Sequence, residues 1–231
     1  MIGMLDTFLE NSFLYFYGLV ILLALFRYSK FFDTPLKYLP ILLMYTFLTE
    51  LLGTIIKSNT DLNPLISGFY SNYTLVFYNT YNFIFFLYFF YIFWSFISSE
   101  KYRKNIVILS ISFIIISLIN PFFQNYILKS QFYAYSYGGL VLIYCIILYL
   151  KENNKILRSK FAKQSLLFWI SIGLLIFYAG YIPIKTYYSF SSFENKELFY
   201  NLRRIHLSLI CIMYSCFIYG FIQMKGKLKT P

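Results

Sequence analysis

Glu50 is the residue of this chain with the clearest capacity for chemistry, because it is the acidic residue that lies deepest within an apolar stretch. A carboxylate in hydrocarbon is costly and needs a partner, so such a residue marks a candidate functional site. The candidate partners are Arg203, Arg204 and His206, at the start of the last apolar stretch. We expect the acid to pair with Arg204, or with Arg203 or His206. The pair would either belong to a binding site or be a structural ion pair that only fixes helix register.

Further polar residues fall at a depth similar to that of the buried acid, in the second, third and sixth apolar stretches. These residues are Thr46, Asn79, Asn82, Tyr178 and Tyr181. One third of the molecule would therefore collect an acid, two arginines, the single histidine, two amides and several phenols. The pattern predicts an outward-facing polar pocket that binds a small molecule.

The same residues argue against most catalytic sites. His206 is the single histidine, whereas a zinc-dependent hydrolase needs two or three. A Ser/His/Asp arrangement would need an acid at intramembrane depth beside a histidine, and no aspartate lies there. The three cysteines, Cys145, Cys211 and Cys216, fall inside apolar stretches and form no metal-binding spacing. We expect neither an enzyme nor a metal or cofactor site.

Seven apolar stretches take up most of the 231 residues and must position these side chains. Hydrophobic residues make up 59% of the chain and charged residues only 13%, too few to cover a water-exposed surface. A hydrocarbon core of roughly 30 Å needs about 20 apolar residues in a helix. The expected spans are 8–28, 36–57, 72–98, 105–123, 132–150, 165–185 and 203–224. The sequence predicts an all-α bundle of seven transmembrane helices that forms one domain over 1–231.

The charges predict how the bundle is threaded. Most of the Lys and Arg residues follow the first, third, fifth and seventh stretches. Because short basic loops stay in the cytoplasm, the N-terminus is expected outside and the C-terminus inside, in the cytoplasmic membrane of the cell. The net charge of +11 then reflects topology and attraction to anionic lipid, and no nucleic-acid partner is expected.

The loops on the expected outer side are the longest, at 58–71 and 186–202. Lys185 is placed at the junction of the second of these loops with the sixth stretch. Pro183 is expected to kink or to end that helix, because proline removes a backbone donor.

The third stretch is aromatic on nearly every face. It reads YTLVFYNTYNFIFFLYFFYIFW from Tyr73 to Trp94. Aromatic side chains fill volume with few rotatable bonds, so packing against lipid and neighbouring helices explains this composition. The alternative is an aromatic-lined ligand cavity or pore.

Two functions from different classes fit these features. The first is a non-enzymatic membrane sensor or signalling partner that reads a small molecule in the outer pocket and acts through another protein. The alternative is an oligomeric channel, transporter or membrane effector subunit. A pore would need polar residues in the inner half of the spans, and that half is almost wholly apolar.

The basic loop after the fifth stretch is the expected contact with a cytoplasmic or membrane partner protein. A homo-oligomer is the alternative to such a partner. The loop holds Lys151, Lys155, Arg158, Lys160 and Lys163. The simpler interpretation is that these charges only fix topology and touch lipid headgroups.

Three short motifs resemble those of an uncharacterised family of small seven-helix membrane proteins from Bacteroidota-type bacteria. They are FLTELLG (Phe47–Gly53), NYTLVFYNTYNF in the third stretch, and FWISIGLLIFYAG (Phe168–Gly180), with the histidine that opens the seventh stretch. Related sequences tend to have an acid in the third span, where this chain has Asn82. The resemblance implies the seven-helix fold and its topology, and it carries no assigned activity.

Overall fold

A computed structural model describes residues 2–58, 64–153, 165–190 and 196–228, with side chains over 12–51, 75–153, 165–190 and 197–228. The described residues form helices and connecting turns and contain no strand. The α-helices are α1 (Ile2–Phe26), α2 (Leu39–Ser58), α3 (Pro64–Phe96), α4 (Glu100–Ile119), α5 (Phe132–Glu152), α7 (Leu166–Phe190) and α8 (Lys196–Gln223). Short 3₁₀ turns are η1 (Tyr28–Lys30), η2 (Pro35–Tyr38) and η3 (Asn120–Phe122).

Five helical segments within the described residues are long and apolar enough to cross a membrane. They are Leu75–Phe96, Glu100–Phe122, Phe132–Glu152, Leu166–Phe190 and Glu197–Gln223. In hydrocarbon a chain must satisfy its own backbone hydrogen bonds, and an α-helix does so within a single segment. The fold therefore has the form of a multi-pass membrane protein.

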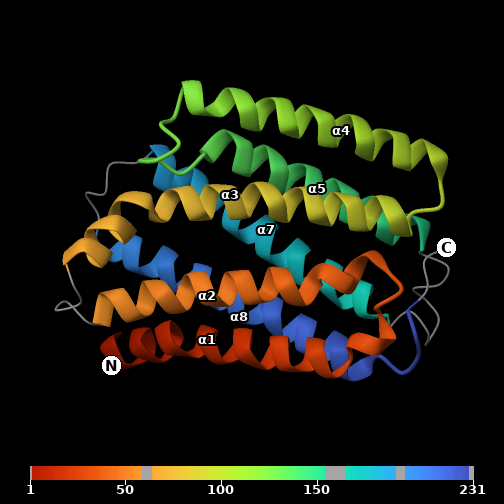
Figure 1. Cartoon of the computed structure of the whole chain (residues 1–231), viewed down its shortest axis with the longest axis horizontal. Coiled ribbons are helices and arrows are strands. Elements are labelled where there is room, and N and C mark those ends of the chain that lie inside the picture. Colours follow the sequence, from red (N-terminus) through yellow and green to blue (C-terminus); the bar gives the residue numbers. More distant parts are fainter. Residues whose placement is uncertain (1, 59–63, 154–164, 191–195, 229–231) are drawn as a thin grey trace.

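The contacts between the helices join six of them into a closed ring, and the seventh lies outside it. Around the ring, α1 packs on α2, α2 on α3, α3 on α5, α5 on α7, α7 on α8, and α8 on α1. Helix α4 contacts α3 and α5 from the outside and runs along the upper edge in Figure 1. Only 17% of the residues in its most apolar window are buried, so α4 presents most of its surface outward.

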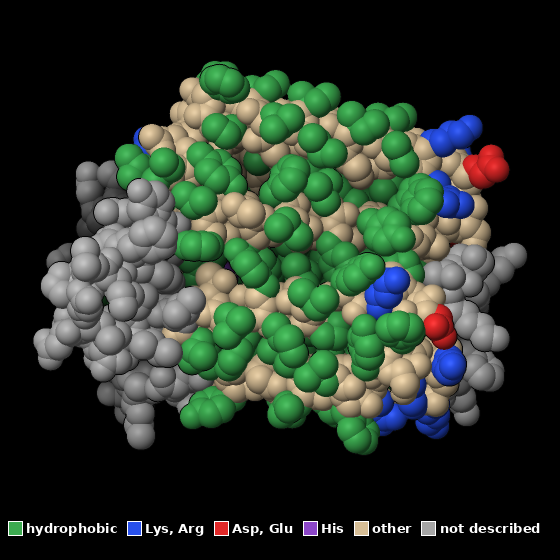
Figure 2. Space-filling view, viewed as in Figure 1, with side chains coloured by type: hydrophobic (Ala, Val, Ile, Leu, Met, Phe, Trp, Pro, Cys, Tyr) green, Lys and Arg blue, Asp and Glu red, His purple; other side chains and the backbone are tan. Residues whose placement is uncertain are grey.

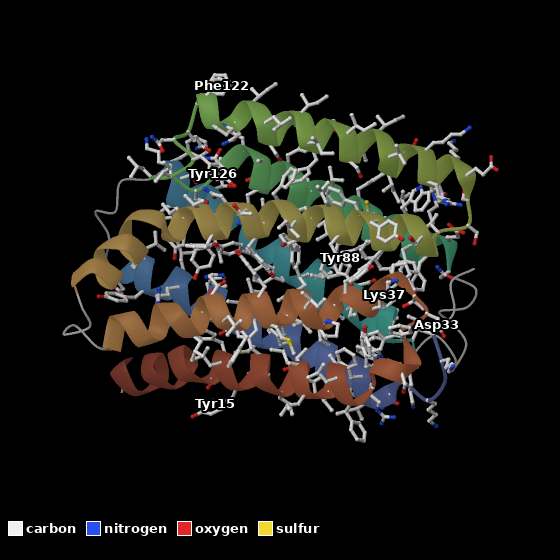
Figure 3. All side chains as sticks on the ribbon, viewed as in Figure 1. Tyr15, Asp33, Lys37, Tyr88, Phe122 and Tyr126 are labelled. Carbon is white, nitrogen blue, oxygen red and sulfur yellow. The ribbon has the colours of Figure 1, made fainter. Side chains whose placement is uncertain are left out.

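The exterior of the bundle is apolar along its length. Figure 2 shows hydrophobic side chains spread over the visible face between the two ends. Tyr15 and Phe122 point away from the helices (Figure 3) and are 78% and 86% exposed. Apolar exposure on this scale would be a liability in water but suits a surface that faces lipid.

Basic side chains gather at one end of the bundle, on the right in Figure 2. This basic end contains the link between α1 and α2, the start of α4 and the chain after α8. The Lys30 ammonium donates to the Met224 carbonyl oxygen at 2.9 Å, and Leu228 N–H donates to the Lys30 carbonyl oxygen at 2.8 Å. Asp33, labelled with Lys37 in Figure 3, forms an ion pair with Lys227 at 4.0 Å. These contacts tie the end of α8 to the α1–α2 link.

Local sequence explains how the chain enters α2. The Thr34 hydroxyl accepts a hydrogen bond from Leu36 N–H at 3.3 Å, and Pro35 takes the first position of η2. A proline there costs little, because the N–H it lacks would have no partner in the first turn. The Tyr88 hydroxyl on α3, labelled in Figure 3, donates to the Pro35 carbonyl oxygen at 3.2 Å and holds this turn against the bundle.

The expected loop boundaries were wrong on the side opposite the basic end. Helix α3 begins at Pro64, α7 continues past Pro183 to Phe190, and α8 begins at Lys196. Most of the expected loops 58–71 and 186–202 is therefore helical among the described residues. Pro183 does not end its helix, because neighbouring helices and side chains can satisfy a backbone carbonyl that loses its donor. The longer α7 places Lys185 inside the helix.

Candidate functional site

A cavity of about 320 Å³ lies inside the six-helix ring, toward the end opposite the basic end. Every helix of the ring contributes to its wall, and α4 contributes nothing among the described residues. Its lining consists of Tyr17, Thr46, Thr49, Glu50, Leu75, Tyr78, Tyr81, Asn82, Phe85, Ser130, Tyr135, Phe177, Tyr178, Tyr181, Lys185, His206, Ile210, Met213 and Tyr214. We call this the ring cavity. Six of the nine residues predicted for the outer pocket lie on it.

One wall of the ring cavity carries the buried acid. Thr46, Thr49 and Glu50 share a face of α2 because side chains three and four residues apart lie one above the other on a helix. The Tyr78 hydroxyl of α3 donates to Glu50 Oε1 at 3.1 Å, and the Thr46 and Tyr81 hydroxyls lie 2.8 Å apart. These contacts join α2 to α3 and fix the carboxylate on the cavity wall.

The opposite wall carries Lys185, which the sequence had placed at the edge of a loop. Its ammonium donates to the Ser130 hydroxyl at 2.8 Å and lies 4.1 Å from the centre of the Tyr135 ring. It forms no ion pair with any carboxylate in the described part of the chain. A partly buried ammonium held by a hydroxyl and an aromatic face gains a cation–π attraction. The ring cavity thus has an acid on one side and a base on the other.

His206 lies on the α8 wall beside Lys185. Its imidazole stacks on the Tyr181 ring, with centroids 4.1 Å apart and planes inclined by 19°. Tyr181 in turn stacks on Phe177 at 5.3 Å, so the histidine belongs to an aromatic column that runs along α7. This position makes His206 a neighbour of anything bound near Lys185.

The floor of the ring cavity is closed by aromatic and aliphatic side chains. Tyr17 of α1 and Tyr214 of α8 meet there with ring centroids 4.4 Å apart. Further toward the basic end, each helix of the ring presents residues that are almost completely buried. Among them are Val20, Leu43, Phe89, Leu142, Leu174 and Phe217. The ring cavity therefore ends blind near the middle of the bundle.

Asn79 does not line the ring cavity, although it was expected beside Glu50. Its amide donates to the Tyr126 and Lys129 carbonyl oxygens at 2.9 and 3.0 Å, and its Oδ1 accepts from Gln131 N–H at 3.1 Å. Asn79 and Asn82 are three residues apart, but only the second faces the cavity that holds Glu50. Asn79 instead clamps the segment between α4 and α5 onto α3, and Figure 3 shows Tyr126 in this segment.

The two arginines also fall outside the ring cavity. Arg203 and Arg204 are partly buried in the first turns of α8, and Arg204 donates to the Asn201 side-chain oxygen at 3.3 Å. Tyr78 of α3 donates one hydrogen bond to Glu50. A pair between Glu50 and either arginine or His206 stays a prediction.

A second cavity of about 290 Å³ lies between α3, α4 and α5. Asn79 is on its wall, and Asn82 and Tyr135 separate it from the ring cavity, since both line the two spaces. The Ser117 hydroxyl also lines it and is buried without a hydrogen-bond partner in the described structure. The remaining walls are mainly phenylalanine and aliphatic side chains.

The predicted partner loop lies largely outside the described residues. Lys151 is exposed near the end of α5, and Lys155, Arg158, Lys160 and Lys163 fall in the gap between α5 and α7. The role proposed for these residues therefore stays a prediction.

Sequence reasoning missed Lys185 together with its supports Ser130 and Tyr135. The helical spacing could have identified the lysine as a site residue. Tyr178, Tyr181 and Lys185 are separated by three and four residues, so they share one face of α7. The error came from ending the helix near Pro183. No comparable pattern in the sequence brings Ser130, which lies outside any helix, against that face.

The searched part of the chain holds no cluster of three His, Cys, Asp or Glu residues that could bind a metal ion. The chain matches no protein-family model, no curated protein and no solved structure. The resemblance to a small seven-helix family therefore remains a prediction, and the function has to be argued from the ring cavity.

Proposed function

We propose that this protein is a non-enzymatic membrane sensor that binds a small molecule in the ring cavity and passes its occupancy to a partner protein. The observation that carries the proposal is the composition of the cavity wall: Glu50, Lys185 and His206 converge on one closed-ended space. Charged groups at this depth are costly unless they have a use or a partner. A ligand-sized, mostly apolar cavity with a few convergent polar groups is the usual form of a binding site.

We propose further that all seven helices cross the cytoplasmic membrane, with the N-terminus outside. The concentration of lysine and arginine at the basic end supports this orientation, because short basic segments stay in the cytoplasm. Helix α2 belongs among the spans because it completes the ring between α1 and α3. In this orientation the ring cavity lies in the outer half of the membrane.

The packed floor favours a sensor over a channel. A conducting path needs a continuous row of polar groups or a gated constriction, and the layer below Tyr17 and Tyr214 is apolar and buried. A transporter that alternates between two conformations, or an oligomeric effector, remains the second candidate. Transporters bind their substrates near the membrane midplane, and the closed end of the ring cavity reaches that depth.

A path for the signal runs along α1 and α8. Tyr17 and Tyr214 touch at the cavity floor, and the hydrogen bond from Lys30 to Met224 joins the segments that follow these two helices at the basic end. A ligand that separates the two tyrosines would therefore bias contacts on the cytoplasmic side. The exposed Lys151 and the basic loop that follows it are the proposed partner contact.

The accessibility of Asn82 from each side of the membrane tests the proposal. Asn82→Cys is made in a variant whose three native cysteines are alanine, and a membrane-impermeant maleimide is added to intact cells or to inverted vesicles. We expect labelling from the outside alone. Ile84→Cys is the matched control, because Ile84 is 51% exposed on the apolar exterior of the same helix and should not react from either side.

Each other outcome would overturn a stated part of the proposal. Labelling of Asn82→Cys from both sides would identify a through-going path and favour the channel or transporter. Labelling from the inside alone would reverse the topology. Absence of labelling from either side would mean that the cavity is not reached from water.

A further inference from the structure

We propose that the second cavity, between α3, α4 and α5, binds a small uncharged molecule with an aromatic body and one oxygen acceptor. The inference goes beyond the proposed sensor and does not depend on it, because Asn82 and Tyr135 separate this cavity from the ring cavity. It is carried by the contrast between an apolar wall without charges and one buried hydroxyl. That hydroxyl belongs to Ser117 and has no hydrogen-bond partner in the described structure.

The serines of α4 show that the Ser117 hydroxyl lacks the usual partner. Ser110 donates to the Ile106 carbonyl oxygen at 2.7 Å, and Ser112 donates to the Leu109 carbonyl oxygen at 2.8 Å. A serine within a helix commonly satisfies its hydroxyl in this way. Ser117 forms no such bond among the described residues, although its oxygen is buried on the cavity wall. A buried hydroxyl without a partner is costly, and an acceptor placed in the cavity would remove that cost.

Other polar side chains on the wall of the second cavity already have partners. Asn79 forms the three hydrogen bonds described above, and the Gln131 amide donates to the Gln124 carbonyl oxygen at 2.8 Å. The hydroxyls of Tyr126 and Thr80 lie 3.0 Å apart and are bonded to each other. Outside the wall shared with the ring cavity, the open donor of this space is therefore the serine of α4.

The composition of the wall selects an uncharged ligand with an aromatic body. No lysine, arginine, histidine, aspartate or glutamate is among the described residues that line this cavity. A charged group bound there would leave water without meeting an opposite charge, which is costly. The rings of Phe83 and Phe86 lie against Phe113, with centroids 5.8 and 5.5 Å apart. Such rings pack well against a further ring, and a volume of about 290 Å³ suits a small molecule.

The second cavity reaches the apolar exterior of the bundle. Leu118 lies on its wall and is 66% exposed. A ligand dissolved in the bilayer can therefore enter without crossing water. A lipid acyl chain would come from the same source, but it has no acceptor and would leave the Ser117 hydroxyl unsatisfied. The buried hydroxyl thus favours an oxygen-bearing molecule over a hydrocarbon chain.

The test uses the full chain in nanodiscs and three photoreactive probes that differ at a single group. The probes are a trifluoromethyl-diazirinyl benzyl alcohol, the matching toluene and the matching benzoate. They are compared at equal concentrations in the bilayer, and mass spectrometry measures the labelling of residues on the cavity wall. We expect the alcohol to saturate this labelling at a concentration about fivefold lower than the toluene, the effect of one hydrogen bond. The benzoate should label the cavity less than either neutral probe.

Two variants of the cavity wall and two controls sharpen the test. Ser117→Ala should abolish the preference for the alcohol over the toluene. Ser110→Ala should keep it, because Ser110 is on the same helix, does not line this cavity and is already bonded to a backbone oxygen. Ala134→Leu adds volume at a wall residue that is 7% exposed and should abolish saturable labelling by both neutral probes. Ile210→Trp, which fills the ring cavity, should leave the labelling unchanged.

Three results would overturn the inference. Equal labelling by the alcohol and the toluene, or an unchanged preference in Ser117→Ala, would assign the cavity to lipid acyl chains. Labelling by the benzoate as strong as that by the alcohol would show that the site does not select uncharged molecules. Loss of labelling in Ile210→Trp would place the probes in the ring cavity. If neither wall variant yields a monodisperse protein, the comparison of the alcohol with the toluene in the unaltered chain decides alone.

Discussion

The Lys185 ammonium lies 4.1 Å from the centre of the Tyr135 ring, so a base on α7 rests on an aromatic face of α5. Both side chains line the ring cavity, and the Ser130 hydroxyl holds the ammonium from the other side at 2.8 Å. This contact explains how a lysine can lie among aromatic rings in the described structure without a carboxylate. It also fixes the position of the positive charge toward which a ligand would be drawn.

The cation–π contact predicts different effects for two substitutions of Tyr135. Tyr135→Phe keeps the ring face, whereas Tyr135→Leu loses the face and part of the packing against Phe86. We expect Tyr135→Leu to lower the free energy of unfolding by about 1–3 kcal/mol more than Tyr135→Phe. Unfolding by SDS in mixed micelles measures the difference. Tyr133→Leu, at a tyrosine 49% exposed on the same helix, is the control. An equal loss in both Tyr135 variants would contradict this prediction.

Glu50→Gln is expected to leave expression, insertion and folding intact and to abolish the output of the sensor. The amide oxygen of glutamine can still accept the hydrogen bond from Tyr78, so the wall between α2 and α3 keeps its geometry. Tyr78→Phe removes the donor instead and should cost about 1.5–3 kcal/mol, the contribution of a hydrogen bond to a charged group. Co-purification of the partner under mild detergent reports the output. A fully active Glu50→Gln would show that the acid serves structure alone.

The sequence was sufficient to predict the helices, because a helix of this kind is recognised by its apolar composition over a long segment. Each described α-helix overlaps most of an expected span, and five segments are confirmed as long and apolar enough to cross a membrane. The ends were harder to predict. Residues 64–71, 186–190 and 196–202 are polar enough to resemble loops, yet they continue helices that begin or end in the apolar layer.

The sequence was sufficient to predict the depth of the site residues in the bundle, but not the direction in which each side chain points. Glu50, Thr46 and Asn82 could be placed near one another by counting residues along antiparallel helices. The rotation of each helix could not be derived, since α3 is apolar and aromatic on all sides. That missing rotation is why Asn79 was expected in the ring cavity, although it faces Tyr126 and Gln131.

The Asn79 clamp predicts a large loss of stability from a single truncation. Asn79→Ala would remove two donated hydrogen bonds and one accepted bond at a side chain that is 5% exposed. Because buried groups left without partners cost about 1–3 kcal/mol each, we expect a loss of at least 2 kcal/mol in the free energy of unfolding. Asn105→Ala is the control, as Asn105 makes one exposed bond to the Tyr144 hydroxyl at 3.2 Å. Similar losses in the two variants would show that the clamp does not hold the segment.

Two glycine substitutions, one in α7 and one in α1, are predicted to change the stability of the protein in opposite directions. A Cβ at Gly173 would lie 2.8 Å from the Met213 carbonyl oxygen, which is backbone and cannot rotate away. Gly173→Ala should therefore cost about 1–3 kcal/mol through overpacking. A Cβ at Gly18 of α1 would meet no atom within 4 Å, so Gly18→Ala should stabilise the helix by about 0.5–1 kcal/mol. The same unfolding measurement covers both. A stabilised Gly173→Ala would mean that α7 and α8 are less tightly packed.

Filling the ring cavity should abolish ligand binding without unfolding the bundle. Ile210 lines the cavity from α8, and Ile210→Trp would place an indole in the space between Glu50 and Lys185. We expect at least a tenfold loss of affinity for any ligand that occupies this space, measured by titration of the nanodisc-embedded protein. Ile212→Trp is the matched control, because Ile212 lies two residues away on the same helix and is 45% exposed on the apolar exterior. Equal affinity in the two variants would place the ligand elsewhere. Loss of binding in Ile210→Trp alone would assign it to the cavity that all six helices of the ring enclose.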